Sequence, residues 1–214
     1  MSTTHLPKQY VYRCNKIPAR GPQYRSPKSI PWHLFDSVPL VDTVTCAPPL
    51  EPTRVSACWD EEFLYFRFVC QDAYMISDFT ERDDPLYDQD VVEIFIDETG
   101  AGKEYMEIEV SPNNVIFDAM IENGGKGDIV YGNRSWNIDG LETEVAETAG
   151  SLRIYDIRIP MAAFRKPAEA GDCWRANFYR IDEQEDGTRE YQAWSPTGVV
   201  NFHLSQMFGS LQFV

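Results

Sequence analysis

The stretch DDPLYDQDVVEIFID, residues 83–97, decides the fold of this chain because it places acidic residues within an unmistakable β-strand pattern. Side chains of a strand alternate between two faces, so Val92, Ile94 and Ile96 share one face of a strand over residues 91–97. The pattern therefore predicts a strand with one uniformly apolar face and one face that combines acids with apolar side chains. The mixed face carries Val91, Glu93, Phe95 and Asp97.

A second alternating segment follows residues 98–103, which have the composition of a turn, and the two segments predict a β-hairpin. If residues 98–103 form the whole loop, Phe95 lies near Glu107, and Glu93 lies near Glu107 or Glu109. Like charges that face each other across strands are unfavourable by up to about 1 kcal/mol, so this face needs a cation, a shared proton or hydroxyl donors. The alternative is a solvated outer face whose acids only keep the protein soluble.

The length and composition are those of one soluble globular domain. With 214 residues, of which 43% are hydrophobic and 13% aromatic, the chain can bury a substantial core. No apolar run approaches the roughly 20 residues that span a bilayer, so we expect no membrane insertion. The formal net charge of −15 disfavours nucleic acids and anionic membranes as partners. Neutral, polyhydroxylated or cationic ligands are compatible with this charge.

The cysteines and the first residues bear on the cellular compartment. The chain has 5 cysteines without the CxxC spacing of a zinc site, and Cys58 and Cys70 fall inside apolar strand patterns. We expect these two to be buried free thiols, which favours a reducing compartment. Residues 1–10 lack the apolar core of a secretory signal, which predicts a cytoplasmic protein as the sequence stands and an extracellular one if a signal has been removed.

Proline is frequent in the first part of the chain, and strand patterns dominate the rest. We expect residues 1–37 to be an extended, Pro-rich segment packed on the core and residues 38–214 to form a single domain. About nine or ten short strands between turn signals, with little helical periodicity, predict an all-β fold, namely an antiparallel β-sandwich. The expected strands cover residues 55–59, 63–70, 91–97, 105–110, 115–121, 141–146, 151–159, 174–181, 190–194 and 211–214.

Three groups of residues, in this order, resemble the family 9 carbohydrate-binding modules (CBM9) and their single-domain relatives. The first is WDxxFLYF at residues 59–66, and the second is the stretch 83–97 followed by YxEI at 105–108. The third group is WRxNFxR at 174–180, WSPT at 194–197 and FG at 208–209. The resemblance covers residues 38–214 and implies a CBM9-type β-sandwich, with a more distant likeness to DOMON-type haem-binding sandwiches.

The resemblance implies a protein that binds a sugar, often at a chain end, between two aromatic rings, with polar side chains on the hydroxyls and calcium in a structural role. Tyr87 matches the first ring position, and Glu93 matches an acid that accepts hydroxyl hydrogen bonds. For the second ring the resemblance indicates Phe202, with Trp194 close enough in sequence to compete. Pyranose rings suit this design because their C–H faces pack on aromatic rings while their hydroxyls need charged or amide partners.

Three further residues are candidates for ligand contact. Glu107 shares the acidic face of the hairpin. Arg180 lies on the same face of its strand as Phe178 and Asp182, so it could neutralise the acidic hairpin or donate to a ligand oxygen. His203 could hydrogen-bond a sugar, and the alternative is an incidental surface histidine.

A structural calcium site is a further expectation. Asp60, Glu62 and Asp72 could offer the hard oxygen ligands that calcium prefers. They lack the regular spacing of a dedicated calcium loop, so an acidic turn without a bound ion accounts for the same residues.

The preferred function is a non-catalytic protein that binds a mono-, oligo- or polysaccharide. A second hypothesis is a glycoside-active enzyme that uses Glu93 and Glu107 as paired carboxylates. A third is a haem-binding electron-transfer domain, for which His5, His33 and His203 are the available histidines. A fourth is a protein-interaction sandwich whose sugar site has decayed, since a tyrosine and a phenylalanine stand where family members commonly have tryptophans.

Overall fold

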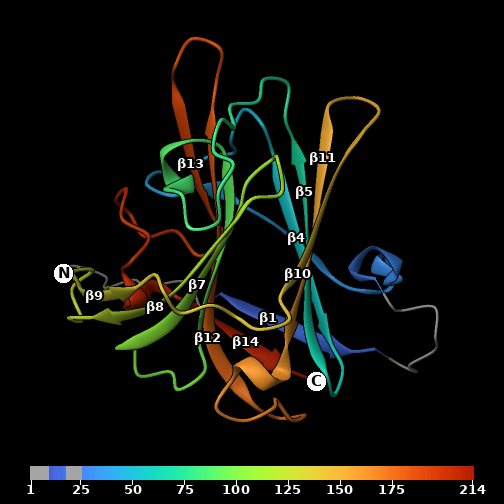
Figure 1. Cartoon of the computed structure of the whole chain (residues 1–214), viewed down its shortest axis with the longest axis vertical. Helices are drawn as coiled ribbons and strands as arrows, with labels where there is room; N and C mark the ends of the chain where they lie inside the picture. Colours follow the sequence, from blue (N-terminus) through green and yellow to red (C-terminus); the bar gives the residue numbers. More distant parts are fainter. Residues whose placement is uncertain (1–9, 18–25) are drawn as a thin grey trace, which may run out of the picture.

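Two layers of strands face each other across a hydrophobic core (Figure 1). The structure, a computed structural model, describes residues 10–17 and 26–214, and within them the strands form one 14-stranded sheet that folds over on itself. The strands are β1 (Val11–Lys16), β2 (Ser37–Pro39), β3 (Val41–Asp42), β4 (Thr53–Trp59), β5 (Phe63–Gln71), β6 (Val91–Asp97), β7 (Glu104–Val110), β8 (Ile116–Asn123), β9 (Ile129–Asn133), β10 (Glu142–Thr148), β11 (Leu152–Pro160), β12 (Cys173–Glu183), β13 (Arg189–Ala193) and β14 (Gly209–Phe213). Single turns of 3-10 helix are η1 (Pro27–Ser29), η2 (Trp32–Leu34), η3 (Leu86–Asp88), η4 (Met161–Ala163) and η5 (Ser205–Met207).

The strand β1 joins the two layers. One layer has the order β10-β11-β5-β4, with β2 also paired to β4, and the other has the order β14-β12-β6-β7-β8-β9, with β13 between β12 and β3. β1 pairs in parallel with β14 through its first residues and with β4 through its last ones. The other strand pairs among the described residues are antiparallel. The predicted all-β sandwich with little helix is confirmed.

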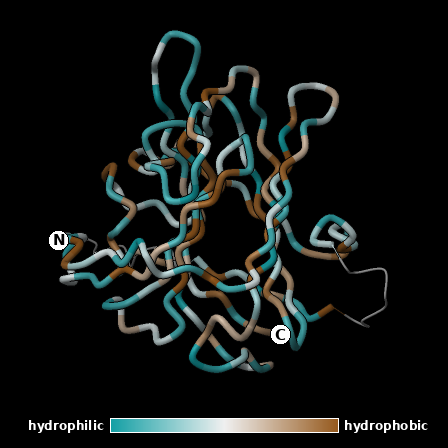
Figure 2. Tube along the Cα trace, viewed as in Figure 1, coloured by the Kyte–Doolittle hydropathy of each residue, from teal (hydrophilic) through white to brown (hydrophobic). Residues whose placement is uncertain are grey.

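The β6–β7 hairpin has the predicted loop and register. Its loop covers residues 98–103, Phe95 lies opposite Glu107, and Glu93 lies opposite Glu109. On one face, the aliphatic side chains of β6 enter the core between the layers, and Figure 2 shows hydrophobic stretches of chain along both sides of this interior. The register therefore brings the acids of both strands onto the opposite face, as the alternation predicted.

The acidic face of the hairpin is buried, so the alternative of a solvated outer face is wrong. The exposed fraction is 2% for Glu93 and 0% for Glu109. A second apolar cluster covers this face and includes Leu86, Phe202 and Phe208, which lie outside the hairpin. Burial of acids that face one another raises the free energy of their charged forms, which makes this face chemically unusual.

The strand count is higher than the predicted nine or ten. The unpredicted strands are β1, β2, β3 and β9. The first three lie in the Pro-rich part of the chain, and β9 follows the Gly-rich residues 123–127, which indicated only a loop. β1, β2 and β3 each pair with a strand that is distant in sequence, whereas β9 forms a hairpin with the preceding strand β8.

Cys58 and Cys70 are buried free thiols, as expected, and Cys14 is a third. Cys46 and Cys173 are exposed and also unpaired. In the part of the chain that the structure describes, no helix has the length and apolar character needed to cross a lipid bilayer.

Candidate functional site

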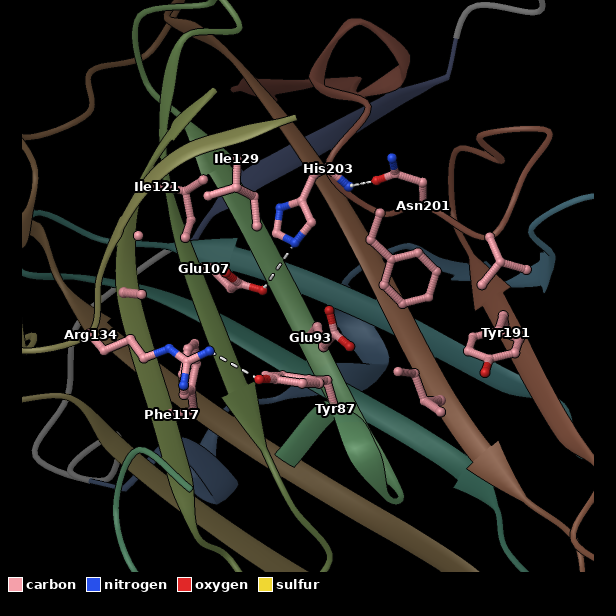
Figure 3. Close-up of a pocket in the computed structure, with 15 residues that line it drawn as sticks. Tyr87, Glu93, Glu107, Phe117, Ile121, Ile129, Arg134, Tyr191, Asn201 and His203 are labelled. Atoms are coloured by element: carbon pink, nitrogen blue, oxygen red, sulfur yellow. Dashed lines mark hydrogen bonds and ion pairs between the residues drawn. The ribbon is translucent and has the colours of Figure 1, made fainter. Parts of the chain in front are cut away.

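A cavity of about 630 Å³ lies over the outer face of β6, β7 and β8 (Figure 3). The stick view shows the carboxyl groups of Glu93 and Glu107 pointing into the space between Tyr87 and His203. The cavity walls are mainly aromatic and aliphatic, which is typical of sites for small molecules. The lining residues are Tyr87, Glu93, Glu107, Phe117, Ala119, Ile121, Ile129, Gly132, Arg134, Ile181, Tyr191, Val200, Asn201, Phe202 and His203.

Glu93 and Glu107 lie in the floor of the cavity, and with the fully buried Glu109, which does not line it, they form a cluster of three carboxyl groups. One oxygen of each lies within 4.8 Å of the others. Among the described residues, no donor outside the cluster reaches Oε1 of Glu93 or either carboxyl oxygen of Glu109, and Glu107 and Glu109 can share a hydrogen bond only if one of them carries a proton. Such groups are costly to bury without a donor, so the floor requires protons or a ligand.

The cluster binds protons more strongly than carboxyl groups in water do. Burial raises the pKa values of Glu93 and Glu109 well above their usual range, and the charges of neighbouring carboxylates add to the rise. Burial also raises the pKa of Glu107 to about 7, although its hydrogen bond with Glu109 and the charge of Arg134 act in the opposite direction. The floor can therefore donate hydrogen bonds as well as accept them.

Glu109→Gln should stabilise the protein above neutral pH. Raised folded-state pKa values mean that the folded protein binds more protons than the unfolded chain, so the contribution of these acids is present below about pH 4.3 and is lost as pH rises to about 7 and beyond. Glutamine cannot ionise, and its amide can donate to the neighbouring acids. Urea unfolding near pH 8 should show a gain of about 1–3 kcal/mol over the native sequence, shrinking toward pH 4.

Glu122→Gln is the matched control for this prediction because Glu122 is exposed on β8. It removes one carboxylate outside the cavity, so the free energy of unfolding should change little at either pH. A Glu109→Gln protein that is less stable than the native sequence near pH 8 would contradict the account of the cluster.

Tyr87 forms one wall of the cavity with help from Arg134. η3 places the half-buried Tyr87 beside Leu86, whose side chain is fully buried and anchors the turn. Arg134 Nη2 donates to Tyr87 Oη at 3.0 Å. The guanidinium carbon lies 6.0 Å from the centre of the Tyr87 ring and 5.6 Å from that of Phe117. Two rings and a cation therefore share this wall.

Phe202 and His203 form another wall. The Phe202 ring stacks on Tyr179 with the ring centres 4.0 Å apart, and Tyr179 Oη donates to the Phe202 carbonyl at 2.9 Å. His203 Nδ1 is hydrogen-bonded to Tyr105 Oη at 2.7 Å, and its Nε2 lies 3.9 Å from Glu107 Oε1. Burial lowers the pKa of His203 to about 4, so its imidazole is neutral at pH 7. The wall thus combines a fixed ring with a neutral imidazole.

Of the predicted ligand residues, the structure brings Tyr87, Glu93, Glu107, Phe202 and His203 together at the cavity. It places the remaining predicted residues, Arg180 and Trp194, on the other side of their sheet.

Trp194 packs in the main core, stacked on Phe178 with the ring centres 5.0 Å apart. Arg180 is paired with Asp182 and donates to the carbonyl of Gln71 at 2.6 Å. Alternation along β12 sends Tyr179 and Ile181 toward the cavity and Arg180 away from it, so Arg180 does not neutralise the hairpin acids.

The predicted calcium ligands Asp60, Glu62 and Asp72 do not come together. Asp60 closes a turn, accepting hydrogen bonds from the backbone N–H groups of Glu62 and Phe63. Asp72 binds Arg153 and belongs to a different acidic group.

That second group consists of Glu51, Asp72 and Asp182. It does not fit calcium, because the Arg180 guanidinium is paired with Asp182 and lies 3.9 Å from Glu51. The cavity cluster does not fit calcium either. Calcium takes six to eight oxygen ligands, and the walls around the three carboxyls are mainly aromatic and aliphatic.

Sequence reasoning missed Phe117, Arg134, Tyr191 and Asn201 at the cavity. Phe117 could have been found from the alternation of β8, which places it on the same face as Ala119. One feature of the sequence could have identified Arg134, because it is a basic residue that follows a Gly-rich stretch in a strongly acidic chain. Asn201 positions the wall, because its side chain accepts from the His203 N–H at 2.9 Å.

Comparisons with known proteins agree with this fold. A curated relative, called "Extracellular protein" and found in Arthroderma benhamiae, is 27% identical over 198 residues, which is 86% of this chain and 87% of that protein. A putative carbohydrate-binding protein from Bacteroides uniformis has a TM-score of 0.76 at 14% identity, over 96% of this chain and 100% of that one.

Two solved structures of a family 9 carbohydrate-binding module from Caldicellulosiruptor kristjanssonii share the fold. The complex with glucose has a TM-score of 0.66 at 15% identity and covers 95% of both chains. The complex with cellotriose has a TM-score of 0.67 at 15% identity, over 95% of this chain and 93% of that one. The model of the family described as "Carbohydrate family 9 binding domain-like" matches residues 38–214. The chain therefore belongs to the carbohydrate family 9 binding domain-like family, as the resemblance of its motifs predicted.

Proposed function

We propose that this protein binds a sugar, without cleaving it, in the cavity over β6, β7 and β8. The observation that carries the proposal is the juxtaposition of Tyr87 and Phe202 with the carboxyl groups of Glu93 and Glu107. These side chains come from the loop before β6, from the hairpin and from the C-terminal part of the chain. Solved neighbours with the same fold are in complex with glucose and cellotriose, which supports a pyranose as the ligand.

The chemistry of the cavity suits one sugar ring. The C–H face of a pyranose packs on an aromatic ring, which Tyr87 and Phe202 supply. Glu93 and Glu107 provide oxygens for the hydroxyls, and in their protonated forms they also donate. His203 offers Nε2, and Arg134 offers further N–H donors. Each hydroxyl can thus exchange its water for a protein partner.

The electrostatics of the floor favour binding over hydrolysis. Glycoside hydrolysis needs two carboxyl groups in different states, one protonated as the acid and one ionised as the base or nucleophile. The pKa values of Glu93, Glu107 and Glu109 are all raised, because burial acts on each in the same direction. These directions mark no one residue as the acid and no other as the base, so we assign the site no catalytic role.

Isothermal titration calorimetry with glucose and cellotriose tests the proposal. We expect saturable binding with Kd between roughly 10 μM and 1 mM, because water competes for each hydroxyl in an open site. We also expect no release of reducing ends when cellotriose is incubated with the protein. Release of reducing ends that is lost in Glu93→Gln would instead support the enzyme hypothesis, and the absence of any sugar binding would contradict the proposal.

A further inference from the structure

We propose that the cavity selects a sugar that carries a free ammonium group, such as a hexosamine, over a neutral sugar of the same shape. This inference rests on the proposed function and names its substrate class. Two independent features of the cavity carry it, namely a buried carboxyl oxygen in the floor that receives no hydrogen bond from the described residues and aromatic rings in the walls.

The floor has more acceptor capacity than the surrounding protein satisfies. Oε1 of Glu93 is buried and receives no hydrogen bond from the described residues, and Glu93 lines the cavity together with Glu107. Glu109 does not line the cavity, and it shares a hydrogen bond with Glu107. A hydroxyl group brings one donor and no charge, whereas an ammonium group brings three donors and a full positive charge. Hydrogen bonds between an ammonium and a carboxylate are roughly twice as strong as neutral ones. The floor therefore matches an ammonium better than a hydroxyl.

The walls are also suited to a cation. The guanidinium of the exposed Arg134 already lies over the rings of Tyr87 and Phe117. Positive charge near an aromatic face gains about 0.5–2 kcal/mol, depending on its exposure to water. Arg134 donates its hydrogen bond to Tyr87, and Glu93 and Glu107 line the same cavity, so their carboxyl groups are open to a second, ligand-borne cation.

The other groups around the floor do not oppose a cation strongly. Among the described residues that line the cavity, Arg134 is the only lysine or arginine. His203 faces Glu107 and is neutral, since burial lowers its pKa to about 4. The phenols of Tyr105 and Tyr179, which pack against the same face, have raised pKa values and stay neutral as well.

Binding of an ammonium should displace a proton from the cluster. Burial raises the pKa values of the unliganded cluster, that of Glu107 to about 7, so the cluster has a proton to release near that pH. When the ammonium arrives, one carboxyl group releases its proton to the solvent, and an N–H bond from the ligand takes its place. The ligand keeps all its protons, so roughly one proton per bound sugar should appear in the buffer.

The test is calorimetric titration of the native protein near pH 7 with D-glucosamine, N-acetyl-D-glucosamine and D-glucose, in two buffers that differ in ionisation enthalpy. Glucosamine should bind at least about tenfold more tightly than either neutral sugar. Its binding enthalpy should depend on the buffer, which reports proton release, and the enthalpies of the neutral sugars should not.

Single substitutions test whether the preference for glucosamine comes from the carboxyl groups of the cavity. In Glu93→Gln, the ratio of glucosamine affinity to glucose affinity should fall to about one, whatever happens to glucose itself. Glu107→Gln provides the same test if Glu93→Gln does not fold. The matched control Glu122→Gln removes an exposed acid of β8 outside the cavity and should keep the ratio of the native protein.

The outcomes separate this inference from the proposed function. If glucose binds and glucosamine binds no better, the inference is overturned and the proposed function stands. If none of the three sugars binds, both are overturned. If ethylamine binds as tightly as glucosamine, the cavity recognises only the ammonium group, and the assignment of a sugar is overturned. If millimolar calcium displaces glucosamine and also binds to the protein in the absence of sugar, the cavity is a metal site and the inference is overturned.

Discussion

Replacement of Tyr87 by alanine should weaken sugar binding by about 2 kcal/mol, which is a roughly thirtyfold increase in Kd. The ring of Tyr87 is half-buried, lines the cavity and meets Phe117 edge-on, so alanine removes one of the aromatic surfaces on which a sugar ring can pack. Because the expected affinity of the native protein is modest, this loss should remove measurable binding of glucose in a calorimetric titration.

Two variants control for this result. Tyr87→Phe keeps the ring and loses only the hydrogen bond from Arg134, so it should keep most of the affinity. Tyr74→Ala removes a partly exposed tyrosine that does not line the cavity, and its Kd should equal that of the native protein. Undiminished binding by Tyr87→Ala would show that the sugar lies elsewhere.

Replacement of Arg180 by alanine should destabilise the fold by about 3–5 kcal/mol, because it leaves buried acids without their cation. The Arg180 side chain is 3% exposed and pairs with Asp182. It also donates to the carbonyls of Gln71 at 2.6 Å and Glu51 at 3.2 Å, which ties β12 to the opposite layer. The loss should lower Tm by roughly 10 °C in a thermal melt.

The matched control is Arg165→Ala. Arg165 is paired with Glu98 and Glu104, but its side chain is 62% exposed, and such surface pairs contribute about 1 kcal/mol or less. A Tm for Arg180→Ala within a few degrees of that for Arg165→Ala would contradict the structural role assigned to Arg180. The role matters for the site because it explains why this arginine is unavailable to a ligand.

The hairpin could be predicted from the sequence because its information is local. The period of two in residues 91–97 assigns every side chain to a face, and the turn over 98–103 then sets the register. The family motifs added Tyr87 and Glu93 at the cavity, where the structure places both.

Burial of the acidic face could not be predicted in the same way. It depends on segments that are distant in sequence, such as β9 and the part of the chain around Phe202. Phe202 reaches the cavity through a loop whose path the sequence pattern does not define, whereas Trp194 directly follows β13 and turns into the core. Strand alternation places Arg180 on the same face of β12 as Phe178, which packs in the main core. The sequence pattern could therefore have indicated that Arg180 points away from the cavity.

The central claim is that a sugar binds between Tyr87 and Phe202, above Glu93 and Glu107. The most direct measurement is a crystal structure of the protein soaked with cellotriose at a saturating concentration. Our account predicts electron density for a pyranose ring packed on Tyr87, with hydroxyl groups within hydrogen-bond distance of the Glu93 or Glu107 carboxyl oxygens. Density for the sugar at another surface, with this cavity filled only by water, would contradict it.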